Sequence, residues 1–187
     1  MKVVESKDIT IGQKIKDEFD NINRELIKEY SKLGGFAKLA SNPIHENDKF
    51  AKQAGHTGII AHGLFSFGFI TKLLDDFLQR EKYGKILKVG VEMRHPVRLG
   101  DKLITEAIVK KIKNKRIYFD VFQKTVTKIH LEKNGKIIKK YEAVERNDIP
   151  EKDQMPKDVK SKEVDEGVLL FREKICSPGY AIIELFK

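Results

Sequence analysis

The chain of 187 residues is long enough for one domain with a buried core, and its 40% hydrophobic residues exclude wholesale disorder. Its 37 basic and 28 acidic residues give a net charge of +9, but only seven of the basic residues are Arg and Trp is absent, which argues against a nucleic-acid-binding surface. The single cysteine, Cys176, excludes an internal disulfide and a Cys-based zinc motif.

The N-terminal region predicts a turn, a strand and a helix. Gly12 marks the turn, and the residues up to Phe19 form the short strand. Asp20 and Asn21 are candidate N-caps for a helix that carries apolar residues at helical spacing as far as Leu33.

A loop and two further helices follow. Pro43 cannot lie inside a helix and restricts Asn42 to an extended conformation. Residues 48–54 predict a short helix that ends at Gly55. Residues 62–80 are apolar on all sides in their first half and amphipathic in the second, which is typical of a helix buried within a domain. Such a helix needs a sheet to cover it.

The middle of the chain supplies strands. Candidates rich in Ile, Val, Thr, Tyr and Phe cover residues 85–93, 102–113, 116–131 and 137–144. In the first of them we expect four alternate side chains on one face, those of Leu87, Val89, Val91 and Met93. Asn134 and Gly135 predict a type I′ turn because both tolerate positive φ. Together the strands predict an antiparallel meander.

The C-terminal part differs in composition from the rest. Residues 147–166 are charged and include two prolines, so they predict an extended connector. Residues 167–187 contain two apolar clusters, and we expect them to pack on the body, where they cap an edge strand or reach a partner. The predicted organisation is a domain over 1–146 and a C-terminal extension over 147–187.

The basic excess lies in the predicted strands. Residues 102–146 hold 13 basic and 5 acidic side chains, whereas residues 147–187 hold 7 and 9. Lysines spaced along alternating strands are typical of a solvated face, so we expect no nucleic-acid partner. The start of the chain lacks the apolar core of a secretory signal, and no apolar stretch approaches the about 20 residues of a membrane-spanning helix. We therefore expect a cytoplasmic protein with no membrane partner.

Three short motifs occur along the chain. They are Asn42-Pro43-Ile44-His45, Ile60-Ala61-His62-Gly63-Leu64 and Pro96-Val97-Arg98-Leu99-Gly100-Asp101. In this order they resemble the MaoC-like, (R)-specific enoyl-CoA hydratase family. The resemblance covers roughly residues 9–146 and implies an α+β hot-dog fold, in which an antiparallel sheet wraps a long central helix. It agrees with the buried helix and the strands predicted above.

The resemblance implies roles for residues of the first two motifs. His45 matches the family's catalytic histidine, a general acid and base. Gly63 matches the glycine that opens the central helix, whose N–H polarises the thioester carbonyl and stabilises the enolate. His62 and Leu64 flank this glycine at the substrate pocket, and we expect nearby backbone groups to satisfy the His62 ring.

One position departs from the family. The catalytic aspartate should stand five positions before His45, where this chain has Ala40. Alanine neither accepts a proton nor orients a water, and Ser41 and Asn42 can hydrogen-bond a water but lack basicity at neutral pH. Losing one member of an acid–base pair costs a factor of about 100 to 10,000 in rate.

Three further residues are candidates for substrate binding. Thr71 lies two turns beyond Gly63, where the family often has a small hydroxyl in the pocket. Arg94 and Arg98 flank Pro96 and are candidates for binding the phosphates of coenzyme A or the acidic surface of an acyl carrier protein. Ordinary surface charge is the alternative interpretation of both arginines.

Two functions are compatible with these residues. The first is a hydratase or dehydratase that interconverts trans-2-enoyl and 3-hydroxyacyl thioesters, with His45 as acid and base. The second is a non-catalytic acyl-thioester-binding subunit, since some heteromeric dehydratases that resemble this family contain one chain without the acid. The resemblance implies a homodimer or a heterodimer with another hot-dog chain, and it implies no cofactor or metal.

Overall fold

The structure is a computed structural model that describes residues 9–20, 22–33, 42–56, 58–80, 84–141 and 159–186. The first half of the chain forms β1 (Lys14–Phe19), α1 (Arg24–Leu33), the 3-10 turn η3 (Pro43–His45), α2 (Asp48–Gln53) and α3 (Gly63–Arg80). The second half forms β2 (Gly84–Val91), β3 (Lys102–Lys113), β4 (Arg116–Lys133), β5 (Lys136–Lys140), β6 (Val159–Val164) and β7 (Gly167–Leu185).

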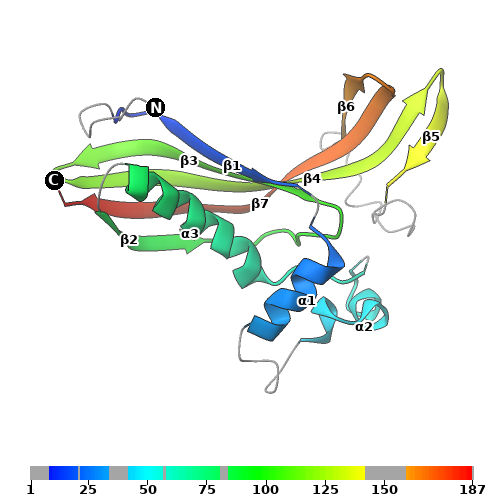
Figure 1. The fold of residues 1–187 in the computed structure, drawn as a ribbon, viewed down its shortest axis with the longest axis horizontal. Helices are drawn as coiled ribbons and strands as arrows, with labels where there is room; N and C mark the ends of the chain where they lie inside the picture. Colours follow the sequence, from blue (N-terminus) through cyan, green and yellow to red (C-terminus); the bar gives the residue numbers. More distant parts are fainter. Residues whose placement is uncertain are drawn as a thin grey trace.

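All strands belong to one antiparallel sheet, and α3 lies along one face of it (Figure 1). The order is β1-β3-β4-β7-β2, with β5 paired to β4 and β6 paired to β7. This arrangement confirms the predicted α+β hot-dog fold. The predicted meander is wrong at its first strand, because β2 pairs with β7 and not with β3. The helix α1 and the short α2 lie beside the start of α3 (Figure 1).

The C-terminal strand β7 is an interior strand of the sheet. It pairs with β4 from Arg116↔Glu184 to Glu132↔Val168, and on its other side with β2. These residues do not cap an edge strand, as one expectation had it, because β7 lies between β4 and β2. A division at residue 146 therefore separates strands of one sheet. The predicted connector, residues 147–166, lies outside the described residues as far as residue 158, and its remaining part forms strand β6, which pairs with β7.

Two local signals set the ends of elements. Asn23, and not Asp20, caps α1, because the Asn23 side-chain oxygen accepts a hydrogen bond from the Leu26 N–H at 2.9 Å. The other candidate cap, Asn21, lies outside the described residues. Asn134 and Gly135 have φ of 51° and 71°, which confirms the predicted turn between β4 and β5.

Strand β2 contains a β-bulge that changes which side chains face the core. The pairing register with β7 shifts between Ile86 and Lys88. Because of this extra residue, Leu87 is 38% exposed instead of sharing the core face with Val89, and Met93 beyond the strand end is 51% exposed. The side chains that pack against the core are Ile86, Val89 and Val91. The predicted single face is wrong for Leu87 and Met93.

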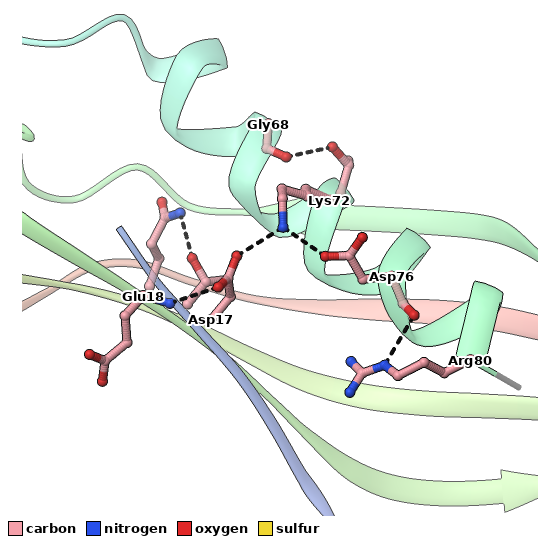
Figure 2. A network of polar contacts seen from close by, with 9 residues as sticks. Asp17, Glu18, Gly68, Lys72, Asp76 and Arg80 are labelled. Carbon is pink, nitrogen blue, oxygen red and sulfur yellow. Dashed lines mark hydrogen bonds and ion pairs between the residues drawn. The ribbon is translucent and has the colours of Figure 1, made fainter. Parts of the chain in front are cut away.

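The main core lies between the second half of α3 and the sheet. Helix residues Leu74 and Phe77 are almost fully buried, and the Phe77 ring meets Phe119 of β4 edge to face with centroids 5.7 Å apart. On the helix surface, the Lys72 ammonium lies 3.2 Å from a carboxylate oxygen of Asp17 and 2.7 Å from one of Asp76 (Figure 2). This contact ties α3 to β1.

The inward face of β4 changes character along its length. Ile117, Phe119 and Val121 are buried in the apolar core, whereas Gln123 and Thr125 continue the same face as buried polar residues. The polar part lies near the start of α3, since the Gln123 amide donates a hydrogen bond to the Ser66 carbonyl at 2.8 Å. No helix in the described part of the chain is long and apolar enough to cross a bilayer.

Candidate functional site

Backbone contacts bring the three sequence motifs together at the start of α3. The Ile60 N–H donates to the Ile44 carbonyl at 3.2 Å, and the Ala61 N–H donates to the Val97 carbonyl at 2.9 Å. Ile60 also forms an antiparallel bridge with Arg98. These contacts place the three segments side by side in the folded chain.

The turn η3 fixes the direction of His45. Asn42 caps it, because its side-chain oxygen accepts from the Ile44 N–H at 3.3 Å while its carbonyl accepts from the His45 N–H at 3.0 Å. Asn42 thereby has a local structural role, and water binding by its side chain stays a prediction. Ala40 and Ser41 lie outside the described residues.

The hydrogen bond of His45 determines which ring nitrogen is basic. Its Nδ1 lies 2.8 Å from the Ile60 carbonyl oxygen. A carbonyl can only accept, so Nδ1 carries the proton and Nε2 of the neutral ring keeps its lone pair. A neutral His45 in this tautomer is equipped to accept a proton at Nε2.

His62 stacks on His45. The ring centroids are 3.8 Å apart and the planes differ by 24°. His62 Nε2 makes a long 3.4 Å contact with the Ser31 hydroxyl, which itself donates to the Ile27 carbonyl at 3.1 Å and so can only accept from His62. The expected backbone partner of His62 is therefore wrong for Nε2. The buried Nδ1 has no hydrogen-bond partner among the described residues.

Burial lowers the pKa of His62 below its ordinary value of 6.5. The charge of a protonated His45 lowers it further, and the Glu46 carboxylate opposes both effects. The physical consequence is that His62 is neutral at neutral pH. Two stacked imidazoles at this distance also resist carrying two charges at once.

Gly63 is the first residue of α3. The Ser66 N–H makes a helical bond to the His62 carbonyl at 3.2 Å, so the N–H groups of Gly63 and Leu64 precede the first helical bond and lie at the positive end of the helix dipole. A Cβ at Gly63 would collide with the Met93 sulfur. Met93 is a flexible side chain that is 51% exposed, so this contact alone does not require glycine, and the oxyanion role of Gly63 stays a prediction. Leu64 is 66% exposed.

The other predicted binding residues lie apart from His45. The Thr71 hydroxyl donates to the Gly68 carbonyl of its own helix at 2.9 Å. Arg94 is exposed and pairs with the Glu92 carboxylate at 2.6 Å. Arg98 is only 7% exposed, and with burial it lowers the pKa of His56. None of these three residues lines the cavity at His45.

A cavity of about 430 Å³ lies between α1 and the η3 region. Its lining consists of Arg24, Lys28, Ser31, Lys32, His45, Glu46 and Ile59. Sequence reasoning missed the contribution of α1, because its cations resemble the polar face of an ordinary amphipathic helix. The available signal was the spacing of Arg24, Lys28 and Lys32, which repeats every four residues.

A buried polar network fixes the third motif. The fully buried Asp101 carboxylate accepts from the Arg98 N–H at 2.8 Å and from the Thr127 hydroxyl at 2.6 Å. Thr127 in turn accepts from the guanidinium of Arg172, which is 1% exposed. Burial raises the pKa of Asp101, and the arginine charges oppose this rise. Through this network β7 supports the turn next to the site.

No three His, Cys, Asp or Glu side chains of the described residues are grouped as metal ligands would be. The Cys176 thiol is fully buried and donates to the Gln123 carbonyl at 3.3 Å. Burial raises the pKa of Cys176 to about 12, so its thiolate is inaccessible at neutral pH. The chemistry available at the site is proton transfer by His45 beside the N–H groups that open α3.

Comparisons with known proteins identify the family and the fold of the chain. The model of the MaoC-like domain family matches residues 10–134. A stretch of 65 residues is 40% identical to a peroxisomal hydratase-dehydrogenase-epimerase of Neurospora crassa. That match covers 35% of this chain and 7% of the Neurospora protein, so the chain corresponds to a small part of this relative.

Two solved structures illustrate the likeness of the fold. The (R)-hydratase from A. caviae involved in PHA biosynthesis aligns with a TM-score of 0.61 at 15% identity, covering 96% of this chain and 99% of that chain. A chain of the ChsH1-ChsH2 complex from Mycobacterium tuberculosis aligns with a TM-score of 0.59 at 10% identity, covering 94% and 98%. At these identities the likeness concerns the fold alone.

Proposed function

Because this chain belongs to the MaoC-like domain family of hydratases and dehydratases, we propose that it adds water to trans-2-enoyl thioesters and removes it from 3-hydroxyacyl thioesters. The observation that carries the proposal is His45, held in one tautomer by the Ile60 carbonyl at the edge of a cavity between α1 and the η3 region. Coenzyme A or a carrier protein would supply the thioester.

His45 performs the proton transfers in this mechanism. Its Nε2 takes a proton from a water, and the water oxygen forms a bond to the β-carbon of the enoyl thioester. The electron pair of the double bond moves toward the thioester oxygen, where the N–H groups that open α3, that of Gly63 first, stabilise the enolate. The imidazolium of His45 then returns the proton to the α-carbon, so that one water has been added.

His62 is the ring that lies directly against His45. The neutral ring of His62 stacks on His45, and an aromatic face is a favourable neighbour for an imidazolium. Since the pKa of His62 is lowered, it does not compete for the proton that His45 carries.

A non-catalytic subunit is the second candidate function. Ala40 favours it, and the structural neighbour from the ChsH1-ChsH2 complex is one chain of a two-component assembly. In this alternative, the chain shapes the acyl site while a second hot-dog chain supplies a complete acid–base pair. The dimeric state and the cytoplasmic location stay predictions.

An activity assay separates the two functions. The purified chain, alone and mixed with a candidate hot-dog partner, is tested for loss of the enoyl-thioester absorbance, with His45→Ala measured in parallel. We expect turnover by the lone chain and a loss of about 100-fold or more in His45→Ala. Activity only in the mixture, unchanged by His45→Ala, would refute catalysis by this chain and support the subunit.

A further inference from the structure

Helix α1 presents a row of cations to the cavity that contains His45. Arg24, Lys28 and Lys32 all line this cavity and follow one another at intervals of four residues. Side chains at this spacing lie on one face of a helix, and the row extends over roughly 12 Å at 1.5 Å per residue. One cavity thus joins the candidate acid–base residue to a line of positive charge.

The charges of α1 are sorted between its faces. The acidic residues of the helix, Glu25 and Glu29, do not line the cavity, and among the described residues that do line it Glu46 is the only carboxylate. Arg24 is committed to Asp48 of α2 through a 2.7 Å ion pair. Within the described part of the chain, Lys28 and Lys32 form no ion pair. Both are exposed, so their ammonium groups are available to a ligand in the cavity.

We infer that Lys28 and Lys32 bind the phosphate end of the pantetheine arm that carries the acyl thioester, an inference that rests on the proposed function. The cavity volume of about 430 Å³ lies in the range of about 300 to 1,000 Å³ that is usual for small-molecule sites. The thioester end of the arm lies toward His45. The negatively charged phosphate lies between the ammonium groups of Lys28 and Lys32, which attract it as two compact positive charges. Both coenzyme A and a carrier protein present this chemistry.

This assignment replaces the phosphate-binding role that the sequence suggested for Arg94 and Arg98, the two arginines that flank Pro96. Arg94 is paired with Glu92 at the surface, and Arg98 is almost fully buried under the loop. Neither lines the cavity, whereas Lys28 and Lys32 do. The phosphate-binding surface is therefore on α1, opposite His45.

Direct binding tests the inference without requiring turnover. The full chain is titrated by calorimetry with coenzyme A, with 4′-phosphopantetheine and with pantetheine, which lacks phosphate. The variant is Lys28→Gln combined with Lys32→Gln. The matched control is Lys49→Gln combined with Lys52→Gln, which removes the same charge from two exposed lysines of α2 that do not line the cavity.

We expect the α1 variant to weaken binding of coenzyme A by about tenfold, to leave pantetheine unchanged, and to remove most of the salt dependence of coenzyme A binding. An equal loss for 4′-phosphopantetheine assigns the site to the phosphate next to pantetheine, which a carrier protein also supplies. A loss of affinity that is seen only with coenzyme A assigns the site to the phosphates that coenzyme A has beyond the one next to pantetheine.

Two results would overturn the inference: unchanged coenzyme A binding in the α1 variant, or an equal loss in the α2 control. The proposed function fails in a different way. A chain that binds coenzyme A through Lys28 and Lys32 but shows no turnover, alone or mixed, loses the hydratase assignment and keeps the phosphate site.

Discussion

The two halves of α3 face different interiors, although both lie on the same face of β4. The second half packs Leu74 and Phe77 against an apolar surface that includes Phe119. The first half begins at Gly63, beside the stacked histidines, where β4 presents Gln123 instead of an apolar side chain. The second half of the helix thus packs on the main apolar core, whereas the first half packs Phe65 and Phe69 on a second apolar cluster and also lies near Gln123 and the stacked histidines.

The largest effect is expected in the core under the second half of α3. Phe119→Ala should lower the free energy of unfolding by about 3 to 5 kcal/mol, because a fully buried ring that contacts Phe77 leaves a cavity. Phe119→Leu keeps most of the volume and should cost less than about 1.5 kcal/mol. Urea denaturation measures both. Coenzyme A affinity per folded molecule should not change, and a parallel loss of affinity would contradict the separation of the two halves.

Restoring the family's aspartate at position 40 tests the candidate site around His45. Ala40→Asp introduces the carboxylate that the family resemblance places five positions before His45, and it should raise the hydration rate by about 100-fold if the remaining site is intact. Steady-state kinetics with a trans-2-enoyl thioester measures the gain. The rise should disappear when His45→Ala is added, and an unchanged rate in Ala40→Asp would show that the pocket has diverged from the family.

The helix start can be tested through its glycine. Gly63→Ala should reduce activity about tenfold, because the methyl group occupies the space where a thioester oxygen approaches the N–H. The same methyl collides with the Met93 side chain, so stability should also fall slightly. Adding Met93→Ala should restore the melting temperature but not the rate. If it restores both, the glycine serves packing and not the oxyanion.

The smallest expected effect is a pH dependence of stability. The pKa of His62 is lowered in the folded chain, so the unfolded chain binds this proton more tightly and the free energy of unfolding falls as pH drops below about 6.5. His62→Phe keeps a stacking ring without a titrating group. Between about pH 7 and pH 5.5 it should lose less stability than the parent chain in urea titrations. His56 titrates in both proteins and cancels, and equal losses would show that His62 is not the group responsible.

Local patterns predicted the elements of the fold well. The buried helix at 62–80 was evident from its apolar composition, and the turn at Asn134 and Gly135 from residues that accept positive φ. The wrong predictions concern residues whose position depends on a partner strand far along the chain. Leu87 was misplaced because a bulge depends on the partner strand, and β7 was misplaced because a charged segment separates it from the strands with which it pairs.

The candidate site was predicted only where motifs mark it. His45 and Gly63 follow from the family resemblance, and the structure brings their segments together through Ile60. The stack of His62 on His45 could not be predicted, because two rings 17 positions apart meet only after the loop folds back. Lys28 and Lys32 belong to no sequence motif. Their placement at the cavity depends on how α1 packs in the folded chain.

The sequence alone determined the family, the helices and turns, and the identity of the candidate acid and base, since periodicity, turn chemistry and short motifs act over a few neighbouring residues. The tertiary structure decided that the C-terminal strand lies inside the sheet and that the cations of α1 face His45. It also decided that the buried Arg172 supports Asp101 through Thr127. These outcomes depend on long-range pairing and packing, in which each residue's partner lies far along the chain and its contribution is defined only once the sheet is assembled.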